Sequence, residues 1–138
     1  MFKARDVMVP REKLEIVEVD EPIVKVAIKI INEGIGSVIV VNKDGELAGI
    51  VTKRDIIRAI MFEKLDPEKT SVERIMSRPL ITIDADTPLD IVIDTMYKYS
   101  VSHLPVIEDN SLVGLVSDYD IVQVVRDLLD ILANKQGM

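Results

Sequence analysis

The chain of 138 residues contains two copies of one pattern, and this internal repeat constrains the fold more than any other feature. Pro22 and Pro88, 66 residues apart, each open an apolar helical pattern. Gly49 and Gly114, 65 residues apart, each interrupt an apolar strand pattern. Because a unit of about 60 residues has a marginal core by itself, we predict that two tandem units pack sheet against sheet as one pseudo-twofold body.

Each copy predicts the order strand, helix, strand, strand, helix. The first strands are expected within residues 14–19 and 80–83. In the second copy Thr87 is a good N-cap and Pro88 suits the first helical position. Gly34 is expected to stop the helix of the first copy. Side chains recur at helical spacing in both helices, namely Val24, Ile28 and Ile31 in the first and Ile91, Thr95 and Met96 in the second.

A strand pair and a final helix complete each copy. In the first copy an Asp-Gly turn separates two runs of β-branched residues, which is a strong hairpin signal. These strands are nearly continuous in apolar character, so we expect them to be buried on both faces. The expected strand pairs are 37–41 with 47–52 and 103–107 with 112–117, and the final helices are 53–64 and 118–133.

The predicted fold class is α+β, built from tandem βαββα repeats. Asp66-Pro67 breaks the chain between the copies. The expected domains are therefore a first repeat at 1–67 and a second at 68–138, which together form one compact module.

Charge and composition exclude several classes of function. Lys and Arg total 17 against 24 Asp and Glu, and the net charge of −7 argues against nucleic acid or an anionic membrane as a partner. The absence of cysteine excludes disulfides and thiolate metal sites. No apolar run approaches the roughly 20 residues that span a bilayer. The first six residues lack the apolar core of a secretory signal, so a cytoplasmic protein is expected.

Two related tetrapeptides carry the most chemical information. Thr52 and Asp55 follow the glycine-containing strand of the first copy, and Ser117 and Asp120 follow that of the second. One interpretation is a capping box at each helix start, which needs no ligand. The other is a ligand site, because a helix N-terminus offers amides to a phosphate and a nearby carboxylate can accept from ribose hydroxyls. The two interpretations are compatible.

Four segments resemble the signatures of the CBS (cystathionine β-synthase) domain family, and the resemblance extends over almost the entire chain. They are Gly-Ile-Val-Thr-Lys-Arg-Asp at 49–55, Val-Ser-His-Leu-Pro-Val at 101–106, and the openings Asp-Val-Met at 6–8 and Glu-Arg-Ile-Met at 73–76. The resemblance implies a stand-alone CBS pair, a Bateman module, with two clefts between the repeats that bind adenine nucleotides. It also implies that the aspartate binds ribose, the hydroxyl and basic groups bind phosphate, and apolar strand residues hold adenine.

The resemblance assigns residues to each cleft. One cleft would use Thr52, Arg54 and Asp55 with Met76, Pro79, Val101, Ser102 and His103, and the other Ser117 and Asp120 with Met8, Pro10, Ile35 and Ser37. The first repeat departs from the family pattern, because Pro105 has no counterpart in residues 38–41. His103 is either structural or borders the phosphate end of its cleft.

The two helix starts differ in charge. The first carries basic residues and the second acidic ones, and one unit charge at about 4 Å is worth roughly 1–4 kcal/mol near a protein surface. A phosphate-bearing ligand is therefore expected to prefer the first cleft. The contrasting residues are Lys53, Arg54 and Arg58 against Asp118, Tyr119 and Asp120.

The leading hypothesis is a regulatory module that senses AMP, ADP, ATP or an S-adenosyl compound, without an obligatory cofactor. It would signal through a separate effector protein or its own oligomer. The resemblance implies a homodimer, and the helix at 118–133 has apolar spacing suited to such an interface. The alternative is a ligand-free structural or interaction module with vestigial clefts. An enzyme is not expected, since no P-loop, metal cluster or activated nucleophile is present.

Overall fold

The computed structural model describes residues 2–77 and 80–135, and the chain divides into two compact units. The first-repeat unit is Leu14–Leu80, and the second-repeat unit combines Met1–Lys13 with Ile81–Met138. The division does not follow the sequence halves, because the segment that leads into each repeat belongs to the unit of the other repeat. We call residues 1–13 and 68–80 the leading segments.

The first-repeat unit contains a three-stranded sheet in the order β2-β3-β4. Strands β2 and β3 are parallel, and β3 and β4 form the antiparallel hairpin that the Asp-Gly turn predicts. Gly45 adopts a φ of 81°, which suits its place in this turn. The elements are β2 (Ile16–Glu18), α2 (Ile23–Glu33), β3 (Ser37–Val41), β4 (Leu47–Thr52), α3 (Lys53–Ile57), the π-helical turn η2 (Arg58–Phe62) and the 3₁₀ turn η3 (Val72–Arg74).

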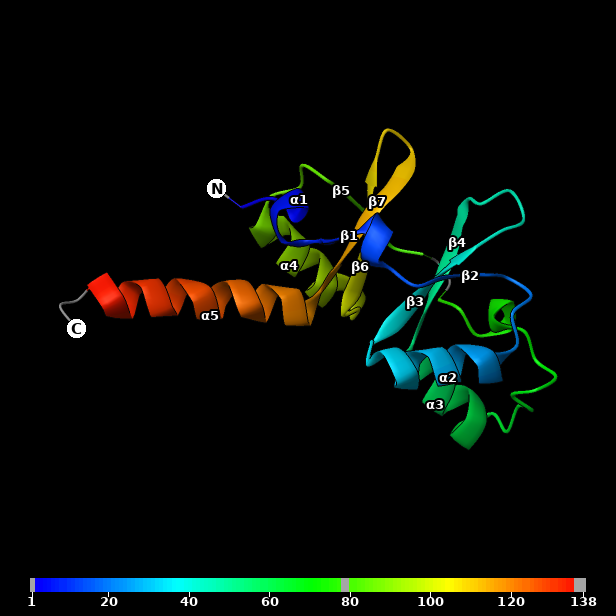
Figure 1. Cartoon of the computed structure of the whole chain (residues 1–138). Coiled ribbons are helices and arrows are strands. Elements are labelled where there is room, and N and C mark those ends of the chain that lie inside the picture. Colours follow the sequence, from blue (N-terminus) through cyan, green and yellow to red (C-terminus); the bar gives the residue numbers. More distant parts are fainter. Residues whose placement is uncertain (1, 78–79, 136–138) are drawn as a thin grey trace. The chain divides into compact units, whose positions relative to one another are not determined.

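The second-repeat unit contains a four-stranded sheet in the order β1-β7-β6-β5 (Figure 1). Asp109 and Asn110 both have positive φ at the β6–β7 turn, as a tight two-residue hairpin requires. The elements are α1 (Ala4–Val7), β1 (Val9–Pro10), η1 (Arg11–Lys13), β5 (Ile83–Asp84), α4 (Leu89–Tyr99), β6 (His103–Glu108), β7 (Ser111–Ser117) and α5 (Asp118–Lys135). The βαββα order is therefore confirmed in both repeats, and the α+β class with it.

The buried face of helix α2 is not the row of Val24, Ile28 and Ile31 that recurs at helical spacing in the sequence. Ile23, Val26 and Ile30 are buried, whereas Ile28 is 51% exposed and Ile31 76% exposed. The helix is apolar at most positions other than its lysines, so spacing alone does not select the face that meets the sheet. In α4 the named row is only partly buried, because Met96 is buried and Thr95 half-buried, whereas Ile91 is exposed and Val92 takes its place in the core.

Helix α4 also begins one residue later than predicted. Pro88, not Thr87, occupies the N-cap position, and the Thr87 amide donates to the Asp84 carbonyl. The predicted stop at Gly34 is confirmed, because this residue ends α2 in the left-handed region at φ 64°. In α4 the corresponding place is taken by Ser100 at φ 53°.

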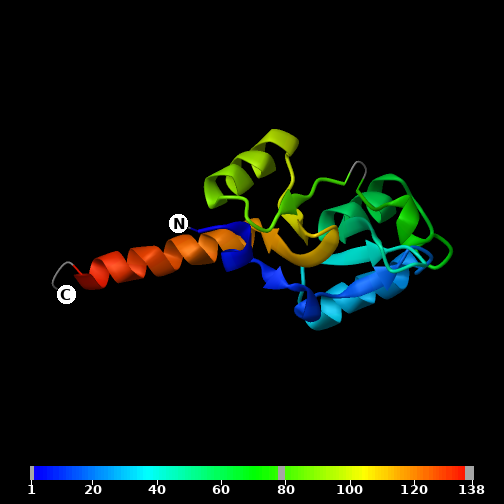
Figure 2. The ribbon, with the colours of Figure 1, turned by 90° about the horizontal axis from the view of Figure 1, so that it is seen from above.

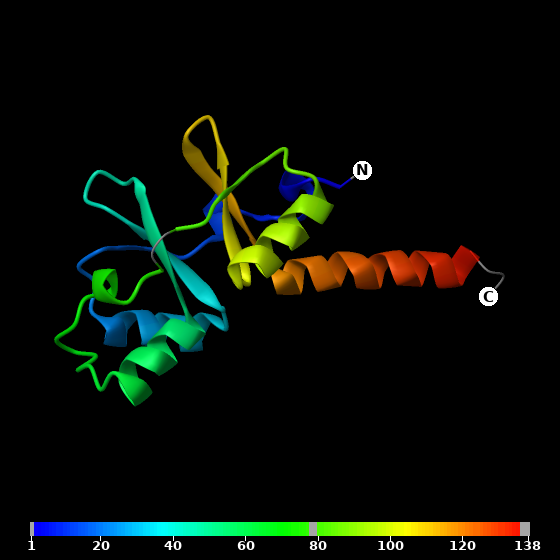
Figure 3. The ribbon, with the colours of Figure 1, turned by 180° about the vertical axis from the view of Figure 1, so that it is seen from behind.

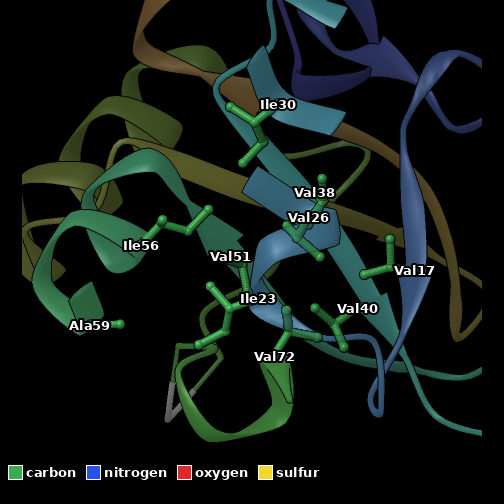
Figure 4. Close-up of a cluster of buried hydrophobic side chains, with 10 residues drawn as sticks. All are labelled: Val17, Ile23, Val26, Ile30, Val38, Val40, Val51, Ile56, Ala59 and Val72. Atoms are coloured by element: carbon green, nitrogen blue, oxygen red, sulfur yellow. The ribbon is translucent and has the colours of Figure 1, made fainter. Parts of the chain in front are cut away.

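The core of the first-repeat unit lies between the sheet and its helices (Figure 4). Leading-segment residue Val72 is fully buried in this core, which shows that η3 closes one end of it. The equivalent residue in the second-repeat unit is Ala4 of α1, also fully buried. The cluster in Figure 4 consists of Val17, Ile23, Val26, Ile30, Val38, Val40, Val51, Ile56, Ala59 and Val72.

Helix α5 is the longest element, and its far half runs beyond the rest of the second-repeat unit (Figures 2 and 3). Within the described ranges, no helix is both long and apolar enough to span a membrane.

Candidate functional site

The junction between β4 and α3 is a complete capping box. The amide and the hydroxyl of Thr52 donate to Oδ2 of Asp55 at 2.8 and 3.0 Å. The Asp55 amide donates back to Oγ1 of Thr52 at 3.3 Å. The Lys53 amide donates to the Gly36 carbonyl at 3.1 Å, which ties the helix start to the turn before β3. The capping interpretation is thus confirmed here.

The junction between β7 and α5 repeats this bonding. The amide and hydroxyl of Ser117 donate to Oδ2 of Asp120 at 2.8 and 2.9 Å, and the Asp120 amide donates to Oγ of Ser117 at 3.2 Å. The Asp118 amide donates to the Ser102 carbonyl at 2.9 Å. In both repeats the cap occupies one carboxylate oxygen, so the cap and a ligand contact through the other oxygen are compatible.

The two junctions differ at the next amide. The Tyr119 amide donates to Oδ1 of Asp118 at 2.8 Å, so a carboxylate already covers this helix end. At the first junction the corresponding Arg54 amide has no acceptor within the described residues. An uncovered amide at a helix start favours an anion, and a covered one does not.

Exposed basic residues lie on the same short helical segment as the uncovered amide. Lys53, Arg54 and Arg58 are exposed, and the Arg58 guanidinium lies 3.7 Å from Oδ1 of Asp55. At the second junction Asp118 is exposed and Asp120 partly buried. The exposed charges near the start of α3 are thus mainly basic and those at the start of α5 acidic, as expected from the sequence.

Each junction is preceded by a glycine against which a methionine packs. A Cβ on Gly49 would lie 2.6 Å from Sδ of Met76, and a Cβ on Gly114 would lie 2.5 Å from Sδ of Met8. A side chain at either position would therefore collide with the leading segment that packs against the strand. Met76 and Met8 are in this way brought to the strands that end at Thr52 and Ser117.

The strand ladders place further predicted residues next to the caps. Ser37 is the register partner of Thr52, and His103 is the register partner of Ser117. Oγ of Ser102 lies 3.0 Å from Nδ1 of His103. Ile35 and Val101, each in the turn before its strand, are partly buried. Pro10 of β1 pairs with Gly114.

Each predicted residue set draws on both units. Within the first-repeat unit lie Thr52, Arg54, Asp55 and Met76 of the first set with Ile35 and Ser37 of the second. Within the second-repeat unit lie Ser117, Asp120, Met8 and Pro10 of the second set with Val101, Ser102 and His103 of the first. Pro79 lies outside the described residues. The joining of the two halves of each set remains a prediction.

Sequence reasoning missed two contributors to these junctions. The carbonyls of Gly36 and Ser102 fix the helix starts, and no side-chain pattern signals a backbone acceptor. The cap that Asp118 places on the Tyr119 amide could have been found, because an acid at the first helical position is a recognised helix-start signal. No group of three or more potential metal ligands occurs in the part of the chain that the structure describes.

Comparison with known proteins agrees with the repeat. The family model described as the CBS domain matches twice, at residues 4–62 and 72–132. The uncharacterized protein MK0525 of Methanopyrus kandleri is 35% identical over 75% of this chain and 54% of its own length. The uncharacterized protein MJ0450 of Methanocaldococcus jannaschii is 28% identical over 91% of this chain and 69% of its own length. The chain thus spans about half to two thirds of these relatives.

Solved structures share the fold over nearly the whole chain. An uncharacterized conserved protein from Pyrococcus horikoshii has a TM-score of 0.83 at 31% identity and covers 90% of this chain and 92% of its own. The CBS domain pair of protein MJ0100, solved with 5′-methylthioadenosine and S-adenosyl-L-methionine, has a TM-score of 0.80 at 29% identity, with 92% and 98% covered. With both repeats matched by the family model and the paired fold shared with solved CBS pairs, the chain belongs to the CBS domain family.

Proposed function

We propose that this chain is a regulatory module that binds an adenosine-containing ligand, and that a phosphate-bearing form such as AMP, ADP or ATP binds at the Thr52–Asp55 junction. The observation that carries this proposal is the uncovered Arg54 amide among exposed basic side chains. A phosphate there gains an amide donor, the positive end of a helical segment and nearby cations.

Individual residues have distinct roles in this proposal. The hydroxyl of Thr52 and the side chain of Arg54 contact phosphate, and Oδ1 of Asp55, which lies outside the cap, accepts from ribose hydroxyls. Met76 and the adjoining apolar strand residues hold adenine. Pro79, Val101, Ser102 and His103 complete this cleft.

The second junction suits a less charged ligand. The Tyr119 amide of this junction already donates to Asp118, and Asp120 adds a second negative charge. A phosphate would meet repulsion there, whereas the ribose hydroxyls of an uncharged or cationic adenosine derivative would not. We assign Ser117, Asp120, Met8, Pro10, Ile35 and Ser37 to this cleft. The bound compounds of the MJ0100 pair, methylthioadenosine and S-adenosyl-L-methionine, belong to this less charged class.

Regulation follows from differential affinity. A ligand shifts an equilibrium only by the difference of its affinities for two arrangements. The proposed output is a change in association, either with an effector protein or with a second copy of this chain.

A second candidate is a ligand-free interaction module. The observation in its favour is that both caps are satisfied by the protein alone, so neither junction needs a ligand for its fold. In this case the clefts are vestigial.

A thermal-shift screen distinguishes the two candidates. Purified protein is heated with AMP, ADP, ATP or S-adenosyl-L-methionine, and with GMP and inorganic phosphate as controls. A ligand at 100 times its dissociation constant adds about 2.7 kcal/mol to stability, which raises the melting temperature by several degrees. A shift with adenosine compounds that GMP does not produce supports the module as a sensor. No shift with any adenosine compound supports the ligand-free module.

A further inference from the structure

Arg58 lies one helical turn beyond Asp55, and the two side chains form a long ion pair. Nη1 of Arg58 is 3.7 Å from Oδ1 of Asp55, which is too long for a hydrogen bond. The cap occupies the other oxygen, Oδ2, with two donors from Thr52. Within the described residues the Arg58 guanidinium has no other side-chain or backbone acceptor. Oδ1 therefore keeps its capacity to accept, and the guanidinium keeps its donors.

The backbone on both sides of Arg58 is held by the core. Ile56 and Ala59 of the same segment are buried and point into the core of the first-repeat unit (Figure 4). At Arg58 the α-helix passes into the π-helical turn η2, and the Glu63 amide donates to the Arg58 carbonyl at 3.0 Å. Such turns are frequent at functional sites. The Arg58 side chain is 57% exposed, so a ligand can reach it.

The distance between this donor and this acceptor is suited to a bridging hydroxyl. A hydroxyl is both a donor and an acceptor, so it can donate to Oδ1 of Asp55 and accept from Arg58 at ordinary distances of about 2.8 Å. Polar groups more than about 3.5 Å apart can be bridged in this way by water. A ribose hydroxyl can take the same place, and both of its hydrogen bonds then involve a charged partner.

The equivalent place in the second repeat lacks the cation. The residue three positions after Asp120 is Gln123 of α5, which is neutral and half-buried. No ion pair in the described part of the chain involves Asp120. A hydroxyl bound by Asp120 would therefore have one charged partner instead of two.

We propose that Arg58 is a specificity-determining residue of the Thr52–Asp55 junction, and that it donates to the same ribose hydroxyl that donates to Oδ1 of Asp55. This inference rests on the proposed function and narrows its ligand to a ribonucleotide. A deoxyribonucleotide without the bridging hydroxyl leaves both charged groups without that partner. A site built to hydrogen-bond a hydroxyl discriminates against an analogue that lacks it.

Calorimetry with AMP, 2′-deoxy-AMP and 3′-deoxy-AMP tests this role in the full chain. The wild type should bind AMP roughly 10- to 100-fold more tightly than the analogue that lacks the bridging hydroxyl, as expected for hydrogen bonds to charged groups. Arg58→Gln should weaken AMP binding roughly 5- to 10-fold more than it weakens binding of that analogue. Selectivity for the hydroxyl thus falls, which a general loss of phosphate attraction does not produce.

Arg54→Gln is the matched control, because it removes the same charge from the same segment at a residue assigned to phosphate. It should weaken binding of AMP and of both analogues by the same factor and leave the selectivity unchanged. If the wild type binds AMP but Arg58→Gln weakens AMP and both analogues equally, this role of Arg58 is overturned and the proposed function stands. A wild type that binds no nucleotide overturns both.

Discussion

At the residue scale, one side chain distinguishes the Thr52–Asp55 junction from the Ser117–Asp120 junction, since the capping hydrogen bonds are otherwise the same in both. Asp118 covers the Tyr119 amide at the start of α5, and no described residue does so for Arg54. A carboxylate at this position supplies the negative charge that a helix start favours, so the protein itself fills the place of an anionic ligand in the second repeat. The proposed ligand preference therefore rests on residue identity at the first helical positions rather than on backbone geometry.

The two strand glycines offer a matched pair of substitutions. The three atoms nearest to a Cβ on Gly49 all belong to the flexible Met76 side chain, whereas a Cβ on Gly114 also meets the Val9 carbonyl oxygen at 2.7 Å. Gly114→Ala must displace the β1–β7 ladder, and we expect it to lower the free energy of unfolding by about 1–3 kcal/mol. Gly49→Ala is expected to cost less, because Met76 can change rotamer. Urea denaturation measures the free energy of unfolding of both variants. Equal losses of stability in Gly49→Ala and Gly114→Ala would contradict this distinction.

At the element scale, α1 is held to its unit by an ion-pair cluster. The Arg5 guanidinium donates to Asp86 at 2.8 Å and also to Glu108, and this pairing raises its pKa. The same hydrogen bond from Arg5 lowers the pKa of the Asp86 carboxyl. The cluster joins the first residues of the chain to the loop before α4 and to the end of β6.

This cluster predicts a pH dependence. Because the folded-state pKa of Asp86 is lowered, its contribution is present above the ordinary aspartate value of about 3.9 and is lost as pH falls through the folded pKa. Arg5→Met should therefore be less stable than the wild type at pH 6, and the difference should shrink toward pH 3. Urea titrations at several pH values measure it. The control Lys13→Met, on exposed η1, should show no such trend, and a pH-independent difference for Arg5→Met would contradict the assignment.

Element order could be predicted from the sequence, whereas helix orientation could not. Hairpins and helix stops depend on local chemistry, so the strands at Ser37–Val41 and Leu47–Thr52 and the stop at Gly34 match the prediction. The buried face of α2 depends on which side meets the sheet, which a helix rich in isoleucine and valine does not encode locally. Likewise, tertiary packing and not local sequence decides that each leading segment joins the unit of the other repeat.

The candidate site shows the same limit. The caps at Thr52 and Ser117 are local and could be predicted, because a hydroxyl and a carboxylate three residues apart suffice. The backbone carbonyls of Gly36 and Ser102, which accept from the helix starts, lie just before the neighbouring strands β3 and β6. A pattern of side chains does not predict such backbone acceptors. Grouping of residues into clefts came only from the family resemblance.

At the scale of the whole molecule, α5 begins at the Ser117–Asp120 junction and carries exposed apolar side chains along its far half. The proposed ligand contact at Asp120 and these exposed side chains thus lie on one helix. Any ligand that binds a dimer of this chain more tightly than the monomer must strengthen dimerisation by the same factor.

The central claim is that the Thr52–Asp55 junction binds the phosphate-bearing ligand, and isothermal titration calorimetry with AMP tests it most directly. Asp55→Ala and Asp120→Ala remove the same cap from equivalent positions, so each controls for the structural cost of the other. Loss of hydrogen bonds to a charged group is worth about 1.5–3 kcal/mol. We therefore predict that Asp55→Ala weakens AMP binding roughly 10- to 100-fold and that Asp120→Ala leaves it nearly unchanged. Loss of AMP binding in Asp120→Ala alone, or no binding by the wild type, would contradict the account.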